Sequence, residues 1–254
     1  MSPVLDQVRA RLMVLLAGQP DPAGLLDASV TVLARPLTPE EAIGTPGRRD
    51  FPIIVGKERV VEATVLGRRG HAFTDSPREL VGSLSEVLQL PLDRNQHRAI
   101  FVATVNALLC HLGRAHTTVH CKDDDPERCA QEIAETLRRQ FGAVEVGLVG
   151  LNPAIAERLV QTFGPEHVRI TDLGRDNIGR ERFGVEVLDG ATQTEELVRR
   201  SDLLLVTGTT LVNGTFDRIH QLAAGKPLIL YGVTAAAVCE MMGIERLCPR
   251  GQDG

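Results

Sequence analysis

Apolar and polar positions divide the chain into two parts with different periods. In the first part, helical spacing alternates with short runs of β-branched residues and with turns rich in glycine or proline. The predicted elements are a helix over 4–17, a strand over 28–33, a loop over 37–50, a hairpin within 51–74 with its turn at 67–70, and helices over 75–88 and 94–112. We therefore expect this part to form an α+β domain.

Strands and helices alternate in the second part, and each strand is almost entirely apolar. Strands are predicted over 144–150, 167–172, 203–206, 227–231 and 244–247, and helices over 154–163 and 194–200, with two more ending at 224 and 242. Such alternation is typical of right-handed crossovers in an open, doubly wound parallel sheet, here of five or six strands. We place the domain boundary so that 1–116 form the α+β domain and 117–254 the α/β domain.

Small polar residues follow the strand at 203–206 directly. The carboxyl ends of parallel strands are where backbone N–H groups of turns and helix starts bind anionic or strongly polar ligands. The candidate binding residues of this turn are Thr207, Gly208, Thr209, Thr210, Asn213 and Thr215. Each of them also has a simpler interpretation, because asparagine and threonine commonly cap a following helix or satisfy a loop.

The first strand of the second part ends in Gly150, Asn152 and Pro153. These residues occupy the place of a dinucleotide fingerprint but lack its spacing, and Pro153 removes one N–H donor. Asp172 follows the next strand, where a ribose-binding acid would stand. A nucleotide-like ligand is thus an open alternative at this edge of the sheet.

A second group of candidate residues lies between the two parts. His120, Cys121 and Cys129 fall within ten residues and offer an imidazole and soft thiolates, which are ligands for transition metals. The spacing of the two cysteines is wider than in a zinc knuckle. A helix start beside Cys129 would lower its thiol pKa, whereas its helical spacing from Ile133 would equally suit a core residue.

The remaining cysteines and histidines have no partner nearby in the sequence, so we expect them to be buried apolar or solvated residues. They are Cys110, Cys239 and Cys248, and His71, His97, His111 and His116.

The composition excludes several classes of partner. The formal net charge is -5 and there is no dense basic tract, which argues against nucleic acid or an anionic membrane as the main partner. Aromatic residues make up 3% and tryptophan is absent, so stacking platforms for bases are not expected. No apolar run approaches the roughly 20 residues that span a bilayer. Five scattered cysteines suit a reducing compartment, and we expect a cytoplasmic protein.

Four stretches together resemble a known family. They are Thr207 to Thr215, His120 to Cys129, Gly56-Lys57-Glu58 and Asn106-Ala107-Leu108. The chain resembles, over nearly its whole length, the pair of domains DUF364 and DUF4213 of the putative heavy-metal chelation family. This resemblance implies an N-terminal domain similar to the enolase N-terminal domain, a C-terminal Rossmann-like domain, and a site where the two meet.

Two functions are compatible with these residues. The first is a metal-handling protein that binds a transition metal, or a small-molecule complex of one, at the cleft between the domains. The second is an enzyme that binds a nucleotide-like or other anionic cofactor in the C-terminal cleft, with Lys57 and Glu58 of the other domain completing the site. We favour the first because of the family resemblance. A homo-oligomer is compatible with the sequence in either case.

Overall fold

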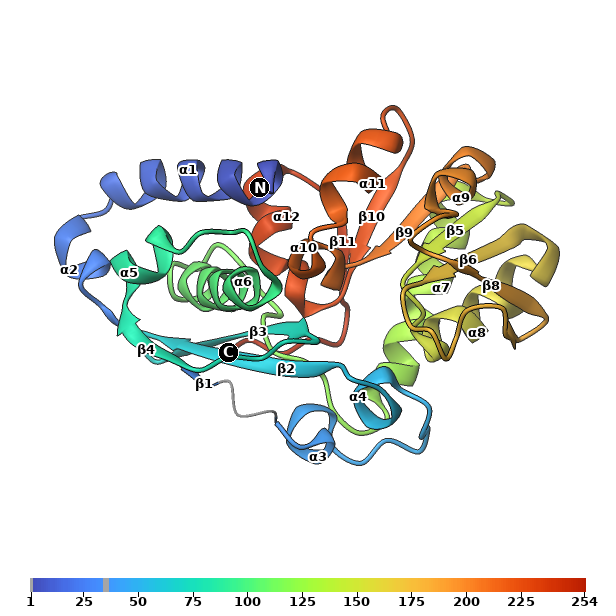
Figure 1. Ribbon diagram of the computed structural model, residues 1–254, viewed down its shortest axis with the longest axis horizontal. Helices are drawn as coiled ribbons and strands as arrows, with labels where there is room; N and C mark the ends of the chain where they lie inside the picture. The colour runs from blue at the N-terminus through green and yellow to red at the C-terminus, as the bar shows by residue number, and fades with distance from the viewer. Residues whose placement is uncertain (1, 34–36) are drawn as a thin grey trace.

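The computed structural model describes residues 2–33 and 37–254 and contains two separate sheets surrounded by helices (Figure 1). One sheet is antiparallel and belongs to the first part of the chain. The other is mostly parallel and belongs to the second part. The chain is thus a mixed α/β protein, and the expected division into two sheets is confirmed. Among the described residues, no helix is long and apolar enough to cross a membrane.

The first part contains four strands in the order β3-β2-β1-β4, with every neighbouring pair antiparallel. Its elements are α1 (Pro3–Ala17), α2 (Pro22–Leu26), β1 (Ser29–Leu33), α3 (Pro39–Ile43), α4 (Pro52–Val55), β2 (Arg59–Val65), β3 (Arg68–Thr74), β4 (Leu80–Ser83), α5 (Leu84–Gln89) and α6 (Asn95–His111). Helices α1 and α6 lie on the same side of this sheet (Figure 1).

Three predictions for the first part were wrong in detail. The hairpin turn lies at Leu66 and Gly67, both with positive φ, whereas it was predicted over 67–70. The helix predicted over 75–88 is instead a loop, the strand β4 and the short helix α5. Ser83 and Glu86 form a capping box that begins α5 at residue 84. The loop predicted over 37–50 contains α3, which a second capping box begins at Thr38.

Helix α6 is buried on every side. All its residues from His97 to Cys110 are buried, because the antiparallel sheet covers one face and elements of the second part cover the other. Asn106 fixes this contact: its side-chain Nδ2 donates to the carbonyls of His71 and Val233, and its Oδ1 accepts from the Ala237 N–H. The two parts of the chain therefore share an interior through α6.

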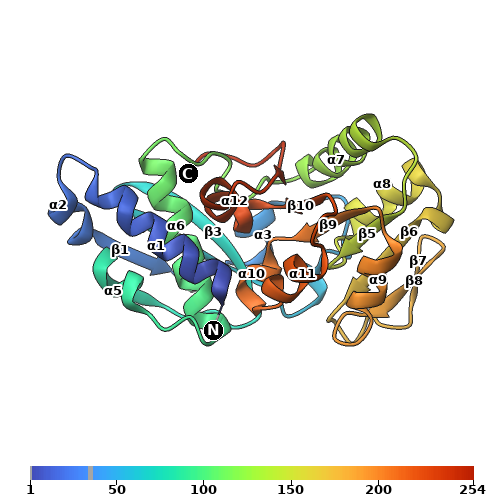
Figure 2. The ribbon, with the colours of Figure 1, turned by 90° about the horizontal axis from the view of Figure 1, so that it is seen from above.

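The second part contains seven strands in the order β11-β10-β9-β5-β6-β8-β7. Its elements are α7 (Asp125–Phe141), β5 (Val146–Val149), α8 (Pro153–Phe163), η1 (Pro165–His167), β6 (Val168–Asp172), β7 (Glu181–Arg182), β8 (Val185–Asp189), α9 (Thr194–Arg200), β9 (Leu203–Thr207), α10 (Thr209–Asn213), α11 (Phe216–Leu222), β10 (Leu228–Tyr231), η2 (Val233–Ala235), α12 (Ala236–Met242) and β11 (Arg246–Leu247). All pairs are parallel except β7 with β8. Seen from above, α7 and α8 lie on one side of this sheet and α9 and α11 on the other (Figure 2).

The apolar runs predicted the strands of this sheet well, but two features were missed. Strands β7 and β8 were not predicted, because charged residues alternate with their apolar ones at the sheet edge. The turn predicted over 207–215 contains the short helix α10, and Gly214, in a left-handed conformation (φ 81°), separates it from α11.

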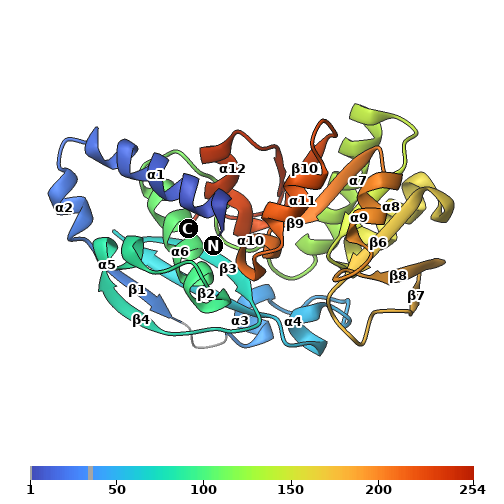
Figure 3. The same ribbon diagram turned by 45° about the horizontal axis from the view of Figure 1, so that its top comes forward.

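Residues 37–58, which we call the strap, connect β1 to β2 but pack on the second part of the chain. Ala42, Ile43, Phe51 and Ile53 are buried in one hydrophobic cluster with residues of α7, α8 and the parallel sheet. Helices α3 and α4 of the strap accordingly lie where the two halves meet (Figure 3). The strap ends at Glu58, which it carries to the carboxyl edge of the parallel sheet.

Candidate functional site

Several polar side chains of the turn after β9 form hydrogen bonds within the turn itself. Thr210 Oγ1 donates to the Thr207 carbonyl at 2.6 Å. Asn213 Oδ1 accepts from the backbone N–H of Thr215 at 3.0 Å and from its hydroxyl at 2.7 Å. These bonds close the end of α10 and the start of α11, so the simpler interpretation of Asn213 as a cap describes what its Oδ1 does.

Both glycines of this turn are explained by packing within the protein. A Cβ on Gly208 would lie 2.9 Å from the Ala235 nitrogen, and one on Gly214 would lie 3.2 Å from the Arg98 guanidinium. Arg98 is buried and donates from Nε to the Val212 carbonyl at 2.6 Å, which fixes the turn to α6. Close approach of a ligand is therefore not needed to account for either glycine.

The turn after β5 lies beside the turn after β9, because β5 and β9 are paired neighbours. A Cβ on Gly150 would lie 2.4 Å from Thr207 Cγ2, and the Tyr231 hydroxyl donates to the Gly150 carbonyl at 2.9 Å. Asn152 caps α8 by accepting from two backbone N–H groups, and Pro153 occupies the first turn of that helix. Four strand ends thus meet here, those of β5, β6, β9 and β10.

Asp172 faces the same edge, but its carboxylate is already bonded. One oxygen accepts from the Leu151 N–H at 2.8 Å, and the other accepts from the Gly174 N–H at 2.6 Å and from Asn177 Nδ2 at 3.2 Å. These contacts hold the turns after β5 and β6 together. A ribose would have to compete with them for the carboxylate.

Glu58 enters this edge from the strap. Its Oε1 accepts from the Thr209 hydroxyl at 3.4 Å. Loss of water around the carboxyl raises the pKa of Glu58 to about 7, and the nearby negative charge of Asp172 contributes in the same direction. Lys57, by contrast, is exposed. Two carboxyl groups in one place disfavour the pyrophosphate of a nucleotide, so this edge supports an anionic ligand less well than a cationic or neutral one.

His120 lies within electrostatic range of Glu58, and its ring is held in place by its neighbours. Its Nδ1 is 2.6 Å from the Cys121 carbonyl, and its ring meets that of Phe73 edge-on with centroids 5.2 Å apart. Because a carbonyl only accepts, Nδ1 carries the proton, which leaves Nε2 as the acceptor in the neutral ring. Burial lowers the pKa of His120 and favours this neutral form.

The backbone of His120 is fixed by a second histidine that the sequence pattern did not single out. The His120 N–H donates to Nδ1 of the buried His71 at 3.2 Å, and the Nε2 of His71 lies 2.8 Å from the Glu62 carboxylate. His71 is thus buried, which is one of the two roles expected for it, and it also has a specific partner. Its partner Glu62 lies opposite it on the paired strand β2, a relation that strand register reveals but sequence distance does not.

Three thiols meet beside His120. The Cys129 thiol is in hydrogen-bonding contact with the thiols of both Cys121 and Cys248. The contact with Cys121 is the largest cause that raises the pKa of Cys129 to about 12, and loss of water adds to it. The expected lowering of this pKa by the helix start was wrong, because the neighbouring thiols and burial outweigh the dipole.

Cys248 is the member of this cluster that the sequence did not predict. We expected an apolar role for it, yet its thiol contacts Cys129 and lies within electrostatic range of His120. Cys121 precedes α7, Cys129 lies near the start of α7, and Cys248 follows β11, so two separate segments supply the thiols. We call Cys121, Cys129, Cys248 and His120 the thiol cluster.

The thiol cluster has the donor chemistry of a soft-metal site, without the arrangement of a finished one. Thiolates and a neutral imidazole are the ligands that zinc and copper(I) prefer. Across residues 2–33 and 37–254, no group of three or more histidine, cysteine, aspartate or glutamate side chains is already placed to hold a metal ion. A metal would thus require the side chains of the cluster to turn towards one another.

Two surface hollows lie away from the thiol cluster. One of about 390 Å³ is bordered by β6, β8 and α9, and one of about 460 Å³ surrounds the start of α6. The second is lined in part by Arg98, which also bonds the turn after β9. Neither hollow is lined by a residue of the thiol cluster.

Comparison with known proteins shows what the chain is similar to. A solved structure of a protein of unknown function from the DUF364 family of Pyrococcus horikoshii matches with a TM-score of 0.52 and 16% identity, covering 91% of this chain and 80% of that one. A second DUF364 protein of unknown function, from Desulfitobacterium hafniense, matches with a TM-score of 0.48 and 15% identity, covering 72% of each chain. At such identities the likeness concerns the fold.

No curated protein matches the chain. The resemblance of the first part to DUF4213 and to the enolase N-terminal domain stays a prediction. The family model DUF364, described as putative heavy-metal chelation, matches residues 132–243. Residues 132–243 are thus similar to the DUF364 family, and the fold of the chain is similar to that of a solved DUF364 protein.

Proposed function

We propose that this protein binds a transition-metal ion, alone or complexed with a small organic molecule, at the junction of its two parts. The thiol cluster would hold the metal. The observation that supports this most is that Cys248, from the end of the chain, meets two cysteines and an imidazole of the 120–129 stretch at one place. The family description, heavy-metal chelation, points to the same class of ligand.

The protonation states of the cluster define how a metal would bind. The pKa of Cys129 and that of Cys248 are raised, so both thiols are neutral at pH 7 in the metal-free protein. A metal must displace their protons to bind thiolate sulfur. Affinity should therefore increase with pH, and the soft ions that bind thiolate most strongly should be preferred over Mg²⁺ or Ca²⁺.

The turn after β9 would then contact the organic part of a metal complex. Glu58, which is within electrostatic range of His120, and the Thr209 hydroxyl offer hydrogen bonds but no positive charge. This arrangement suits a neutral or cationic complex. Lys57 is exposed next to Glu58, and its part in the site stays a prediction.

Titration of the purified protein with Zn²⁺ and Cd²⁺ tests the proposal. The protein is prepared without a metal-affinity tag, its metal content is measured, and the affinities are then obtained by competition with a chelator. We expect one ion per chain, and we expect the double variant Cys121→Ser, Cys129→Ser to lose stoichiometric binding. The matched control is Cys110→Ser with Cys239→Ser, two buried thiols outside the cluster, which should bind as the unmodified protein does.

Equal binding by the two double variants would contradict the proposal. The alternative, an enzyme with a nucleotide-like cofactor, would then gain support if mass spectrometry found such a molecule carried through purification. Glu58 favours some ligand at this edge, because a carboxyl with a raised pKa in a buried junction is a common mark of a binding or catalytic site.

A further inference from the structure

The strap forms one wall of the segment that carries Cys121 and Cys129. The Asp123 N–H donates to the Ile43 carbonyl at 2.9 Å, and Asp123 Oδ1 accepts from the Thr45 N–H at 2.9 Å. Both bonds join the strap to the chain between the two cysteines. Any movement of the strap away from the second part must break them.

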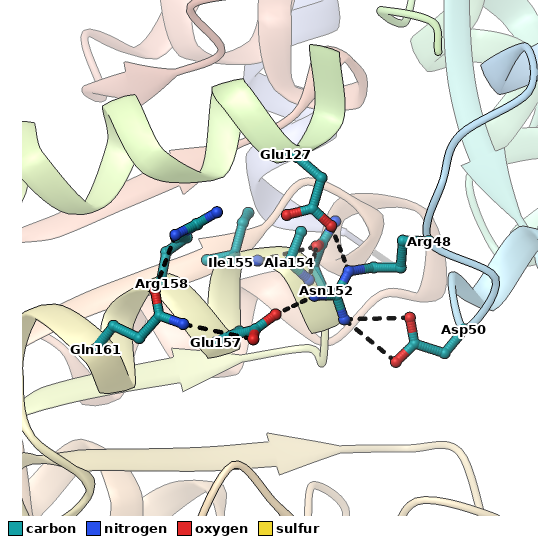
Figure 4. Close-up of polar contacts among 9 residues, drawn as sticks. All are labelled: Arg48, Asp50, Glu127, Asn152, Ala154, Ile155, Glu157, Arg158 and Gln161. Atoms are coloured by element: carbon teal, nitrogen blue, oxygen red, sulfur yellow. Dashed lines mark hydrogen bonds and ion pairs between the residues drawn. The ribbon is translucent and has the colours of Figure 1, made fainter. Parts of the chain in front are cut away.

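A single arginine adds the charged contacts of this wall. Arg48, in the strap, bonds Glu127 in the first turn of α7 and Glu157 in α8, and it also lies 3.3 Å from Asp50 (Figure 4). Its guanidinium stands over the Phe183 ring, 5.8 Å from the centroid. Glu127 is two residues before Cys129 on the same helix, so Arg48 fastens the strap beside the thiol cluster.

The ion pairs of Arg48 are partly shielded from solvent. The Arg48 side chain is 16% exposed, and those of Glu127 and Glu157 are 28% and 30% exposed. Ion pairs of this kind, made by a guanidinium with several acids, contribute more than isolated surface pairs because they are less screened by water. The partners lie on two helices of the second part, so the whole network spans the junction.

We propose that Arg48 is a positioning residue that latches the strap over the thiol cluster, and that release of this latch gives a ligand access to Cys121. The sulfur of Cys121 is the one that needs such access, because this residue is only 3% exposed. Opening is confined to the strap residues between the buried Ile43 and Phe51. It breaks the contacts of Arg48 and Asp123 with each other's side of the junction and leaves the hydrophobic cluster and the antiparallel sheet intact. The biological meaning of the latch rests on the proposed metal site, but the latch itself can be tested without metal.

Site-resolved alkylation of the metal-free, full-length protein measures this opening. The probe is N-ethylmaleimide at pH 8, with time points analysed by peptide mass spectrometry. Cys239 is the matched reference, since it is 4% exposed, close to Cys121 in burial, and lies on α12 away from the strap. Reaction at each buried thiol follows the population of its open form, so a rate ratio reports local opening.

Two variants release the latch from opposite ends. Arg48→Met keeps the length of the side chain and removes its charge, and Glu157→Gln removes one of its partners on a helix that carries no cysteine. We expect alkylation of Cys121 to become about tenfold faster in Arg48→Met and about threefold faster in Glu157→Gln, with Cys239 unchanged. Arg218→Met, which breaks an exposed pair with Glu195 elsewhere, should change neither rate.

The outcomes separate the latch from the metal site. An unchanged Cys121 rate in Arg48→Met overturns the latch, and so does an equal increase at Cys121 and Cys239, which would indicate general loosening. A selective increase at Cys121 supports the latch even if the metal titration finds no binding. If the protein binds metal but Arg48→Met does not change the alkylation rate of Cys121, the proposed function is supported and the latch is contradicted.

Discussion

The turn after β9 and the thiol cluster lie close together at the junction, yet they differ in how their polar groups are used. In the turn, Asn213 caps a helix, Thr210 bonds the backbone and both glycines accommodate neighbouring protein atoms. In the cluster, the Cys129 thiol contacts the thiols of Cys121 and Cys248, and His120 keeps Nε2 as an acceptor. The turn is rich in polar residues that are adjacent in sequence, whereas the cluster is completed by Cys248, which lies far from His120, Cys121 and Cys129 in sequence.

This difference shows why adjacency in sequence is a weak guide to a binding site. Polar residues that follow one another in a turn can satisfy each other locally, and folding gives them every opportunity to do so. Groups brought together from distant segments have no such local partners. Chemistry that remains available for a ligand is therefore more often found where several segments converge.

The sharpest way to break the comparison is to remove the side chain that anchors the turn. Arg98→Met should lower the free energy of unfolding by about 3 kcal/mol, because the carbonyls of Val212 and Leu92 lose charged hydrogen bonds in a buried place. Urea denaturation measures this loss. Arg94→Met, at the N-cap position before α6 and with a side chain 60% exposed, is the control and should change stability by less than about 0.5 kcal/mol.

If the turn is structural, metal affinity of the folded Arg98→Met protein should equal that of the unmodified protein. A large loss of affinity with little loss of stability would show that the turn contacts the ligand directly, and the contrast between the two regions would then fail.

Glu58, which lies between the two regions, predicts a dependence of stability on pH. Its pKa is about 7 in the folded protein and near 4.5 when solvated, so the folded state binds the proton more tightly. This group therefore contributes a loss of stability as pH rises through that window, and the loss is complete above pH 7. Glu58→Gln should gain about 1–2 kcal/mol over the unmodified protein at pH 8, and the gain should vanish at pH 4.

Thermal unfolding of both proteins across this pH range provides the measurement for Glu58. Glu186→Gln, at an exposed position of β8, is a control that should show no such crossover. A constant difference at all pH values would mean that Glu58 is as well solvated in the folded protein as in the unfolded one.

The smallest effect is expected at Asn213. Asn213→Ala removes the acceptor for the Thr215 N–H and hydroxyl and should cost about 1 kcal/mol of stability, the typical value of a helix cap. Affinity for Zn²⁺ or Cd²⁺ should not change. A weaker metal affinity at unchanged melting temperature would instead place the Asn213 amide in contact with the ligand.

Strands buried on both faces were the most predictable part of the fold. The run from Leu203 to Val206 is wholly apolar because it packs against helices on either side, and such a run has few other interpretations. The error at 75–88 has a local cause. Asp75 and Pro77 resemble a helix start, but the helix begins only after Ser83, whose capping box starts α5. Short edge strands such as β4 carry too few residues to establish a period.

The candidate site was less predictable for a reason of geometry. His120, Cys121 and Cys129 lie within one stretch and could be grouped from the sequence, but Cys248 joins them through the pairing of β11 with β10 at the end of the sheet. Glu58 lies at the junction because the strap packs on the second part of the chain. For the same reason Arg48 forms ion pairs there with Glu127 and Glu157. Relations of this kind depend on the order of strands, which apolar periodicity does not determine.

The complete burial of α6 has a consequence for how the protein unfolds. This helix belongs by sequence to the first part, yet its apolar face completes the interior of the second, and the strap does the same from the other direction. Separating the halves would expose both interiors to water at once, at a cost that exceeds the stability of a typical domain. We therefore expect the two sheets to unfold as one cooperative unit, with a single transition for both parts of the chain.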